Sequence, residues 1–369
     1  LLAIEENLYL DLTETCKRLD QLADELADEA DDYALSSLST DLSGAGKQLT
    51  RHRDTLRFFM RMADPEYVYW IEASSFYKSK SVQLYCVPLD VSPLLREHFF
   101  EPKDSVIMTS ATLTVDKSFQ YSSGALGLDP FMETGKLKTS MLPSPFQYRK
   151  QALVLIPRDF PSIRGKADDS AFIAALTDSL AEVAAETKGR MLVLFTSYRM
   201  LKQVHGGLNE KLAPMGMAVL GQGINSLSRS QLTRMFRDRD GCVLLGTSSF
   251  WEGVDIPGEA LSCLAIVRLP FQPPNHPLAE AKSERLRKNG QNPFMALSVP
   301  QAVIRFKQGF GRLVRSSQDR GVVIIYDTRV LETQYGKHFL YSLPGPKIEH
   351  LRATQLVSRI KSWMGGESS

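Results

Sequence analysis

The sequence VLLGTSSFWEGVDIPG, at residues 243–258, joins a short apolar run directly to a loop rich in glycine and hydroxyl side chains. The run at 243–245 has the composition of a buried strand, so the loop is expected to begin at its carboxyl end. In doubly wound α/β sheets, ligands bind just outside the carboxyl ends of the strands. We therefore predict that this loop holds a phosphate group, with Glu252 and Asp255 within reach of a nucleotide or of arginine side chains. The alternative is a tight structural loop around a buried Trp251.

Similar apolar runs recur on both sides of this stretch. Helical segments lie between them, such as residues 170–187, which have Asp169 before them and Gly189 after them. Near-continuous apolar strands that alternate with helices are typical of a parallel sheet covered on both faces. We therefore predict an α/β fold with a doubly wound parallel sheet, whose further strands lie at residues 153–156, 191–195, 218–220, 263–267 and 322–326.

The first sixty or so residues have a helical pattern instead. One face of a first helix is predicted to carry Leu12, Cys16, Leu19, Ala23, Leu26, Ala30 and Tyr33, at alternating spacings of four and three. The Ser- and Gly-rich residues 36–46 are expected to break this pattern. A second helix then runs through Leu49, Leu56, Phe59 and Met60. We expect two antiparallel helices that form a small lobe.

The composition changes after Pro65. Residues 67–71 and 82–87 are rich in β-branched and aromatic side chains and flank a polar turn, so they predict a β-hairpin. Ser92 followed by Pro93 is a typical helix start. Residues 106–108 then have the composition of a short buried strand.

Composition excludes several classes of protein. The 369 residues are 43% hydrophobic and 23% charged, and no apolar run approaches the length that spans a bilayer. The four cysteines are far apart in sequence, which fits isolated thiols in a cytosolic protein better than disulfides, zinc or an iron–sulfur cluster. A formal net charge of +2 means that any nucleic-acid binding must come from a local groove. The chain begins with Leu1 and no signal-peptide pattern, so we expect its start to lie inside a longer protein.

Two short matches to nucleotide-binding motifs are rejected. Residues 43–47, SGAGK, lack the first glycine of a Walker A loop, and Gln48 stands where a magnesium-binding hydroxyl belongs. Residues 28–31, DEAD, lie in the predicted acidic helix rather than after an apolar strand. We interpret the first as a turn between helices and the second as a solvated helix face.

A stronger motif lies at residues 308–315, QGFGRLVR, which fits the pattern Q-x-x-G-R-x-x-R. Two arginines three residues apart on a helix project from the same side. Guanidinium groups are permanently charged forks that match phosphate oxygens. An arginine on a transferring phosphoryl group contributes on the order of 10³ to 10⁵ in rate. The alternative is a surface helix whose arginines pair with nearby acidic side chains.

Taken together, four segments resemble a known family. TSATL (109–113), LFTSY (194–198), FWEGVD (250–255) and QGFGRLVR occur in the order of motifs III, IV, V and VI of superfamily 2 helicases. The wording FWEGVDIPG, with DTR at 327–329 and residues 335–344, is similar to the DinG branch of the XPD-like family. The resemblance covers residues 67–344.

The resemblance implies a domain organisation. Residues 1–64 would form the helical end of an arch domain, 65–114 the C-terminal part of the first RecA-like lobe, and 115–369 the second RecA-like lobe. ATP and Mg²⁺ would be bound mainly by the N-terminal half of the same polypeptide, which carries the Walker motifs. No iron–sulfur cluster is expected in this chain. Whether the parent protein has such a cluster or an exonuclease domain stays open.

It also implies roles for individual residues in a helicase that moves 5′ to 3′ on single-stranded DNA. The catalytic set would be Gln308, Arg312 and Arg315, with the arginines at the γ-phosphate. Nucleotide contacts would come from Glu252, Gly253, Asp255 and Gly311. Residues for DNA binding and coupling would be Ser110, Thr112, Thr196, Ser197, Gln222, Thr247 and Ser248.

Two other functions remain possible from the sequence. One is a motor that feeds DNA to a nuclease domain outside the chain, and the other is a nucleic-acid-binding module without ATPase activity. We expect this chain alone to bind single-stranded DNA weakly and not to hydrolyse ATP. The expected location is the cytoplasm, at the bacterial nucleoid, with a role in DNA repair or replication.

Overall fold

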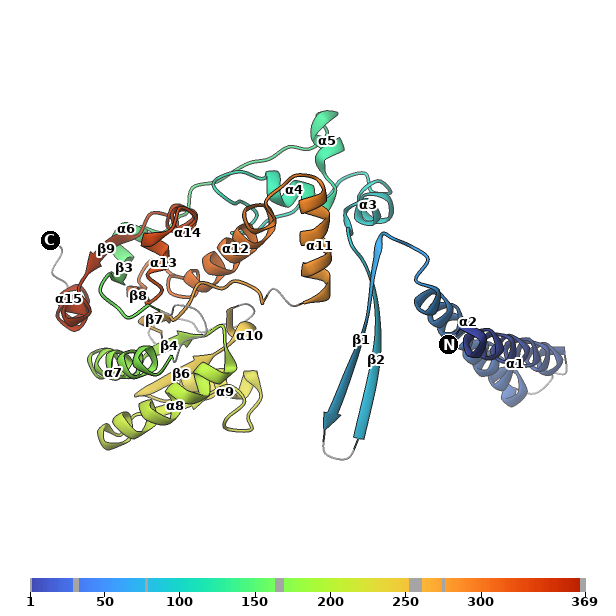
Figure 1. Cartoon of the computed structure of the whole chain (residues 1–369), viewed down its shortest axis with the longest axis horizontal. Helices are drawn as coiled ribbons and strands as arrows, with labels where there is room; N and C mark the ends of the chain where they lie inside the picture. Colours follow the sequence, from blue (N-terminus) through green and yellow to red (C-terminus); the bar gives the residue numbers. More distant parts are fainter. Residues whose placement is uncertain are drawn as a thin grey trace. The chain divides into compact units, whose positions relative to one another are not determined.

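The computed structural model describes residues 2–28, 33–76, 79–162, 169–251, 261–273 and 276–365 (Figure 1). The chain divides into two compact units. One contains Leu1–Val91 and Pro274–Arg285, and the other contains Ser92–Pro273 and Leu286–Ser369.

Two long helices, α1 (Leu2–Asp28) and α2 (Tyr33–Arg61), dominate the first unit. They are antiparallel, because early residues of α1 contact late residues of α2 and the reverse. Arg61 binds Glu6 at 2.7 Å near one end of the pair, and the Ser39 hydroxyl donates to the Ala23 carbonyl at 2.7 Å near the other. The prediction of two antiparallel helices is confirmed.

The predicted break at residues 36–46 is wrong, because these residues lie inside α2. Serine and glycine have modest helix propensities, but packing of an amphipathic face outweighs propensity in a long helix pair. Gly46 lies in this packed face, since a Cβ built on it would be 3.0 Å from the Asp20 carboxylate of α1. The SGAGK segment is therefore helix interior, neither a phosphate loop nor the expected turn. Of the DEAD segment, Asp28 ends α1, and residues 29–31 lie outside the described ranges.

The predicted hairpin is also present. Strands β1 (Tyr67–Phe76) and β2 (Ser79–Pro88) pair antiparallel, with Trp70 opposite Tyr85 and their rings stacked at 4.7 Å. The first residues of α11 (Pro277–Lys288) belong to the same unit, where Arg285 binds Glu66 at 2.6 Å.

The second unit contains a parallel sheet, which in the described part of the chain has seven strands in the order β5-β6-β4-β7-β8-β3-β9 (Figure 1). All six predicted strands of this sheet are confirmed. Their bounds are β3 (Ala152–Pro157), β4 (Met191–Leu194), β5 (Ala218–Gly221), β6 (Cys242–Gly246), β7 (Cys263–Ile266) and β8 (Gly321–Ile325).

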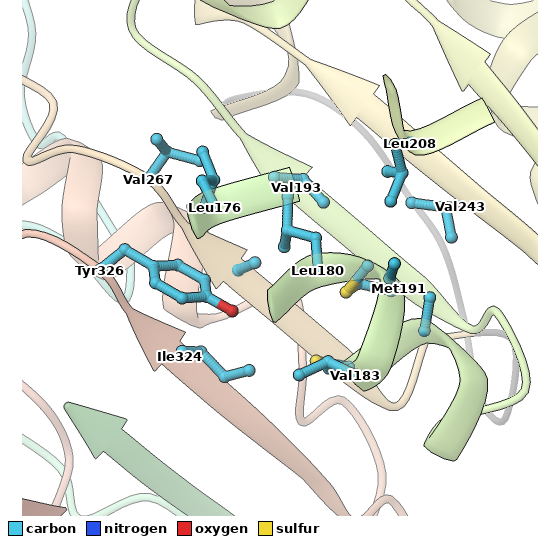
Figure 2. Close-up of a cluster of buried hydrophobic side chains, with 14 of the residues drawn as sticks. Leu176, Leu180, Val183, Met191, Val193, Leu208, Val243, Val267, Ile324 and Tyr326 are labelled. Carbon is cyan, nitrogen blue, oxygen red and sulfur yellow. The ribbon is translucent and has the colours of Figure 1, made fainter. Parts of the chain in front are cut away.

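The apolar runs are continuous because both faces of the sheet are buried. On one face, Leu155, Val193 and Ile324 pack against α7 (Ser170–Glu186), α8 (Tyr198–Leu212) and α15 (Leu356–Met364), and Figure 2 shows part of this cluster. On the other face, Val154 and Leu194 pack against α9 (Arg229–Asp238) and α12 (Val299–Phe310). This is the doubly wound arrangement that the sequence predicted.

Shorter helices complete this unit. The start predicted at Ser92-Pro93 is confirmed by α3 (Ser92–Leu95), which continues into a π-helical turn at Arg96–Phe100. The remaining helices include α4 (Gln120–Leu126), α5 (Asp129–Glu133), α6 (Tyr148–Gln151), α10 (Ser248–Trp251), α13 (Arg329–Glu332) and α14 (Gly336–Tyr341).

Two strand assignments differ from the sequence-based expectation. Residues 106–108 are not a buried strand, since they have no regular structure and Ile107 is 93% exposed. An apolar run forms a strand only where a neighbouring strand accepts its hydrogen bonds, and none of the described strands pairs with this one. Conversely, the edge strand β9 (Lys347–Leu351) was not predicted. Its charged, half-exposed residues lack the pattern of a buried strand.

Candidate nucleotide and nucleic-acid site

The carboxyl ends of β5, β6 and β4 lie side by side at one edge of the sheet, because these strands are parallel neighbours. Gln222 follows β5 and Thr247 follows β6. The Gln222 side-chain oxygen accepts hydrogen bonds from the Thr247 amide at 2.8 Å and from its hydroxyl at 2.9 Å. The Gln222 amide nitrogen donates to the Ser249 hydroxyl at 3.0 Å. The structure thus joins two of the predicted DNA-binding residues and adds Ser249.

Thr196 and Ser197 follow β4, the next strand along. Leu194 is in register with Gly246, so Thr196 lies at the level of Ser248 on the neighbouring strand. Thr196 and Ser248 are both exposed. Ser197 begins α8 as its N-cap, where its hydroxyl accepts a hydrogen bond from the Met200 amide at 3.4 Å. Five predicted residues therefore share one edge of the sheet, and we call Gln222, Thr247, Ser248, Thr196 and Ser197 the hydroxyl row.

Two arginines that the sequence reasoning missed flank this row. Arg229 is the first residue of α9, whose N-terminus has a capping box of Ser228 and Gln231, and its guanidinium donates to the Ser249 carbonyl at 3.1 Å. Arg268 follows β7, the strand beside β4. A single arginine after a strand matches no motif, and only the strand order reveals that both lie at this edge.

Arg268 is held loosely by its acidic neighbour. Its guanidinium lies 3.8 Å from the Asp169 carboxylate, and 28% of its side chain is exposed. Burial lowers the pKa of Arg268, while the charge of Asp169 opposes that shift. Even a lowered arginine pKa leaves the group protonated at neutral pH. Arg268 therefore adds a permanent positive charge beside the uncharged hydroxyl row.

The second part of the site is the end of α12. The helix ends at Phe310, so Arg312 and Arg315 lie in the turn and loop that follow it. The expectation that the two arginines project from one side of a helix is therefore wrong. Gly309 and Gly311 lie on either side of Phe310, the last residue of α12. The chain turns after the helix, and both Phe310 and Leu313 are buried in the core. Gln308 is the only member of the predicted catalytic set that is helical.

Arg312 is connected to the hydroxyl row through Trp251. Its guanidinium donates to the Trp251 carbonyl at 3.0 Å, and the Trp251 indole N–H donates to the Phe195 carbonyl at 3.2 Å. Trp251 is only 2% exposed, as the structural alternative for this loop expected. Phe195 immediately precedes Thr196. A chain of three residues thus joins an arginine of the motif to the end of β4.

Arg315 begins a tightly bonded loop. The Arg315 and Ser316 amides donate to one oxygen of Asp319 at 2.8 and 2.9 Å, and the Ser316 hydroxyl donates to the other at 2.7 Å. Burial acts to raise the pKa of Asp319, but these hydrogen bonds outweigh it and the pKa is lowered. Gln151, the last residue of α6, closes the loop, since its amide donates to the carbonyls of Ser316 and Asp319 at 2.9 Å each. The backbone at Arg315 is therefore fixed.

Ser110 and Thr112 line a cavity of about 710 Å³. Their hydroxyls are 3.1 Å apart. Lys307, Phe310 and Gly311, at the end of α12, line the same cavity. The structure therefore brings the predicted coupling residues next to the helix end that carries the arginine motif.

Part of the predicted site lies outside the described ranges. This applies to Glu252, Gly253 and Asp255, so their proposed contacts with nucleotide stay predictions. Gly311 is described and is exposed at the end of α12. Across the described ranges, no three His, Cys, Asp or Glu side chains come together in a way that could hold a metal ion. None of the described helices is both long and apolar enough to cross a membrane.

Comparison with known proteins agrees with this geometry. The family model for the helicase C-terminal domain matches residues 180–345, which include the hydroxyl row and the arginine motif. These residues therefore match a helicase C-terminal domain. This domain contains every strand of the sheet from β4 to β8, so the two parts of the site both belong to it.

Several curated relatives match over most of the chain. The Bacillus subtilis (strain 168) protein named 3′-5′ exonuclease DinG is 40% identical over 314 residues, which are 85% of this chain and 33% of the relative. The Escherichia coli (strain K12) ATP-dependent DNA helicase YoaA is 35% identical over 303 residues, 82% of this chain and 45% of the relative. The Mycobacterium tuberculosis (strain H37Rv) ATP-dependent helicase DinG is 34% identical, covering 86% and 46%. The chain therefore spans a third to a little under half of these relatives. Together with the domain match, they confirm the predicted DinG-like superfamily 2 helicase C-terminal half.

Solved structures show the same fold. An XPD helicase structure aligns with a TM-score of 0.52 at 19% identity, covering 89% of this chain and 55% of that one. An apo XPD structure aligns with a TM-score of 0.53 at 18% identity, covering 88% and 61%. The predicted RecA-like α/β fold is confirmed.

Proposed function

We propose that this chain is the second motor lobe of an ATP-dependent helicase that moves 5′ to 3′ along single-stranded DNA. In this proposal the hydroxyl row, with Arg229 and Arg268 beside it, grips the DNA backbone without reading its sequence. Arg312 and Arg315 act on the γ-phosphate of an ATP molecule bound mainly by the N-terminal half of the same polypeptide. The domains are those expected from the sequence, with boundaries at 64/65 and 114/115.

The observation that carries the proposal is the connection from Arg312 through Trp251 to Phe195. A motor must transmit the state of its nucleotide to its grip on DNA. Two hydrogen bonds through Trp251 connect Arg312 with the Phe195 carbonyl, next to Thr196 of the hydroxyl row. Charge on the γ-phosphate favours closure of two lobes around ATP, and its loss on hydrolysis removes that preference. Glu252, Gly253, Asp255 and Gly311 complete the nucleotide contacts in the proposal.

Among the described residues, no group of three His, Cys, Asp or Glu side chains could hold Mg²⁺. We assign it to the N-terminal half, where it would neutralise phosphate charge. This chain alone is then expected not to hydrolyse ATP. The names of the YoaA and DinG helicase relatives support ATP use, and that of YoaA, an ATP-dependent DNA helicase, also supports DNA as substrate. Action at single-strand/duplex junctions, a role in repair or replication, and a cytoplasmic, nucleoid-associated location belong to the same proposal.

The deciding experiment measures single-stranded-DNA-stimulated ATP hydrolysis by the complete polypeptide. Arg315→Ala is expected to lower turnover by about 10³-fold or more, because a phosphate-binding arginine is lost, and to leave DNA affinity nearly unchanged. Arg320→Ala is the matched control, since Arg320 is half-buried in the same segment but stacks on Trp363 at 4.4 Å. Turnover that survives Arg315→Ala would remove the arginine's catalytic role and favour a binding module without ATPase activity.

Direction is tested with two duplexes that carry a single-stranded tail at either the 5′ or the 3′ end. The proposal predicts displacement of the strand only from the 5′-tailed substrate. Equal displacement from both tails, or displacement from the 3′ tail alone, would contradict the proposed polarity.

A nuclease motor is the second candidate, because the Bacillus subtilis relative is named an exonuclease. In that case this chain would move DNA towards a nuclease domain outside its own residues. End-labelled duplex incubated with ATP and Mg²⁺ separates the two functions. Full-length displaced strands indicate a helicase, whereas progressive shortening without displacement indicates a nuclease motor.

A further inference from the structure

Lys307 makes an unusual contact one residue before the arginine motif begins. Its ammonium group, on α12, donates to the Thr114 carbonyl at 2.8 Å and lies 3.4 Å from the Thr114 hydroxyl. Burial lowers the pKa of Lys307. It forms no ion pair with any acidic residue that the structure describes. The cation is therefore directed at a backbone carbonyl 193 residues away in sequence rather than at a carboxylate.

Three other contacts fix the same short stretch of chain. The Ser122 hydroxyl of α4 donates to the Leu113 carbonyl at 2.6 Å. Val115 is buried in the core cluster of the sheet and exchanges backbone hydrogen bonds with Ser118 at 3.0 and 2.9 Å. These contacts hold residues on both sides of Thr114.

The Asp116 carboxylate completes this set, since it lies 2.6 Å from the Nδ1 atom of His338 in α14. The residues just upstream differ sharply. Residues 101–111 are exposed, and the hydrogen bonds of Ser110 join it only to Thr112 among the described residues. Residues 101–111 are thus exposed, whereas residues 113–116 are each held by a contact with another part of the chain.

We propose that Lys307 is a positioning residue that fastens the chain at Thr114 to the helix bearing the arginine motif, so that a movement of the exposed residues just before Leu113 reaches that helix. This inference rests on the proposed two-lobe motor. A shift of Ser110 and Thr112 would then be passed through Thr114 to the end of α12, where Gln308 and Arg312 lie. Lys307 reaches no phosphate in this role and acts only through the residues that do.

The test compares Lys307→Met with Lys307→Arg in the complete polypeptide. The methionine keeps the length of the side chain but removes the donor, whereas arginine restores a donor to the Thr114 carbonyl. Lys202→Met, at an exposed lysine on α8, controls for loss of one positive charge. The readouts are the rate of ATP hydrolysis without DNA, its maximum with single-stranded DNA, and the dissociation constant for that DNA.

Lys307→Met is expected to reduce the DNA-stimulated rate about tenfold, with little change in the rate without DNA or in DNA affinity. Lys307→Arg is expected to recover most of the stimulation, and Lys202→Met to behave as the unchanged protein. Stimulation that survives Lys307→Met would overturn the inference. So would an equal loss of both rates without recovery by arginine, which indicates only a structural role.

A failure of the proposed function is visible separately, because the unchanged protein would then show no DNA-stimulated hydrolysis. If Lys307→Met does not fold, Ser122→Ala carries the test, since it removes the 2.6 Å hydrogen bond to Leu113. A loss of stimulation in Ser122→Ala with an unchanged rate without DNA supports the anchor. Unchanged stimulation overturns it.

Discussion

Gly309 decides whether Trp251 can occupy its position between β4 and α12. A Cβ built on Gly309 would lie 2.9 and 3.0 Å from two atoms of the indole ring and 3.3 Å from a Leu194 methyl group. The indole could then no longer reach the Phe195 carbonyl without displacing the helix. Gly309, at a variable position of the Q-x-x-G-R-x-x-R pattern, is therefore a packing requirement, and it sets the path from Arg312 to the end of β4.

Gly309→Ala is expected to lower the free energy of unfolding of this chain by roughly 1–3 kcal/mol, because overpacking outweighs the helix propensity of alanine. Gly206→Ala is the control, since Gly206 lies in α8 and a Cβ added there would have nothing within 4 Å. That variant should gain roughly 0.5–1 kcal/mol. Urea unfolding measures both changes. Similar stability of the two variants would show that Trp251 does not restrict this position.

At the scale of elements, β9 and α15 close the sheet through charged groups rather than an apolar run. The Glu349 carboxylate of β9 accepts two hydrogen bonds from Arg359 of α15, at 2.6 and 2.8 Å, and binds Lys347 at 3.1 Å. Arg359 is the main cause that lowers the pKa of Glu349, burial opposes it, and Lys347 lowers it further. These pairings explain why a strand of mixed charge is stable at the sheet edge.

A lowered folded-state pKa means that Glu349 stabilises the fold above its unfolded pKa of about 4.3 and loses this effect as the pH falls through its folded value. The difference in free energy of unfolding between the unchanged chain and Glu349→Gln should therefore be fully present at pH 7, decline as the pH falls below the unfolded pKa, and disappear only below the lowered folded pKa. Urea unfolding across this range checks the prediction, with Glu332→Gln in α13 as control. A difference independent of pH would contradict it.

At the scale of the whole molecule, a formal net charge of +2 gives little long-range attraction for DNA. Binding to the phosphate backbone must therefore depend on cations placed at the carboxyl edge of the sheet. Arg229 and Arg268 are placed there because α9 begins, and β7 ends, at the same edge as the hydroxyl row. Arg237 lies at the other end of α9, where it pairs with Asp238 at 2.9 Å.

Arg229→Gln and Arg268→Gln should each weaken binding of single-stranded DNA and reduce the slope of log affinity against log salt by about 0.7, the value for one phosphate contact on a single strand. The double variant should reduce it by about 1.4. Affinity measured at several salt concentrations gives the slope. Arg237→Gln is the matched control and should leave the slope unchanged. Equal slopes for all variants would remove these two arginines from the proposed DNA path.

Local sequence predicted most of the elements. Apolar runs of three to five residues identified six strands of the sheet, because a strand buried on both faces needs no partner-specific pattern. The wording of the motifs also predicted the helicase C-terminal half. The local sequence pattern gave the wrong secondary structure where the conformation depends on contacts with an element distant in sequence. Residues 106–108 pair with none of the described strands, and β9 depends on Arg359. Residues 36–46 are helical inside α2, where Ser39 and Gly46 lie against α1.

The sequence by itself thus determined the type of fold, the order of its strands along the chain and the residue types suited to phosphate. The tertiary structure alone decided which of these residues meet. The spatial order β5-β6-β4-β7 puts Gln222, Thr247, Thr196 and Arg268 on one edge, although they are spread from residue 196 to 268. The same packing places Lys307 on Thr114 and Arg312 on Trp251. Such contacts arise because elements distant in sequence bury their apolar faces together, and no local pattern encodes which pairs will do so.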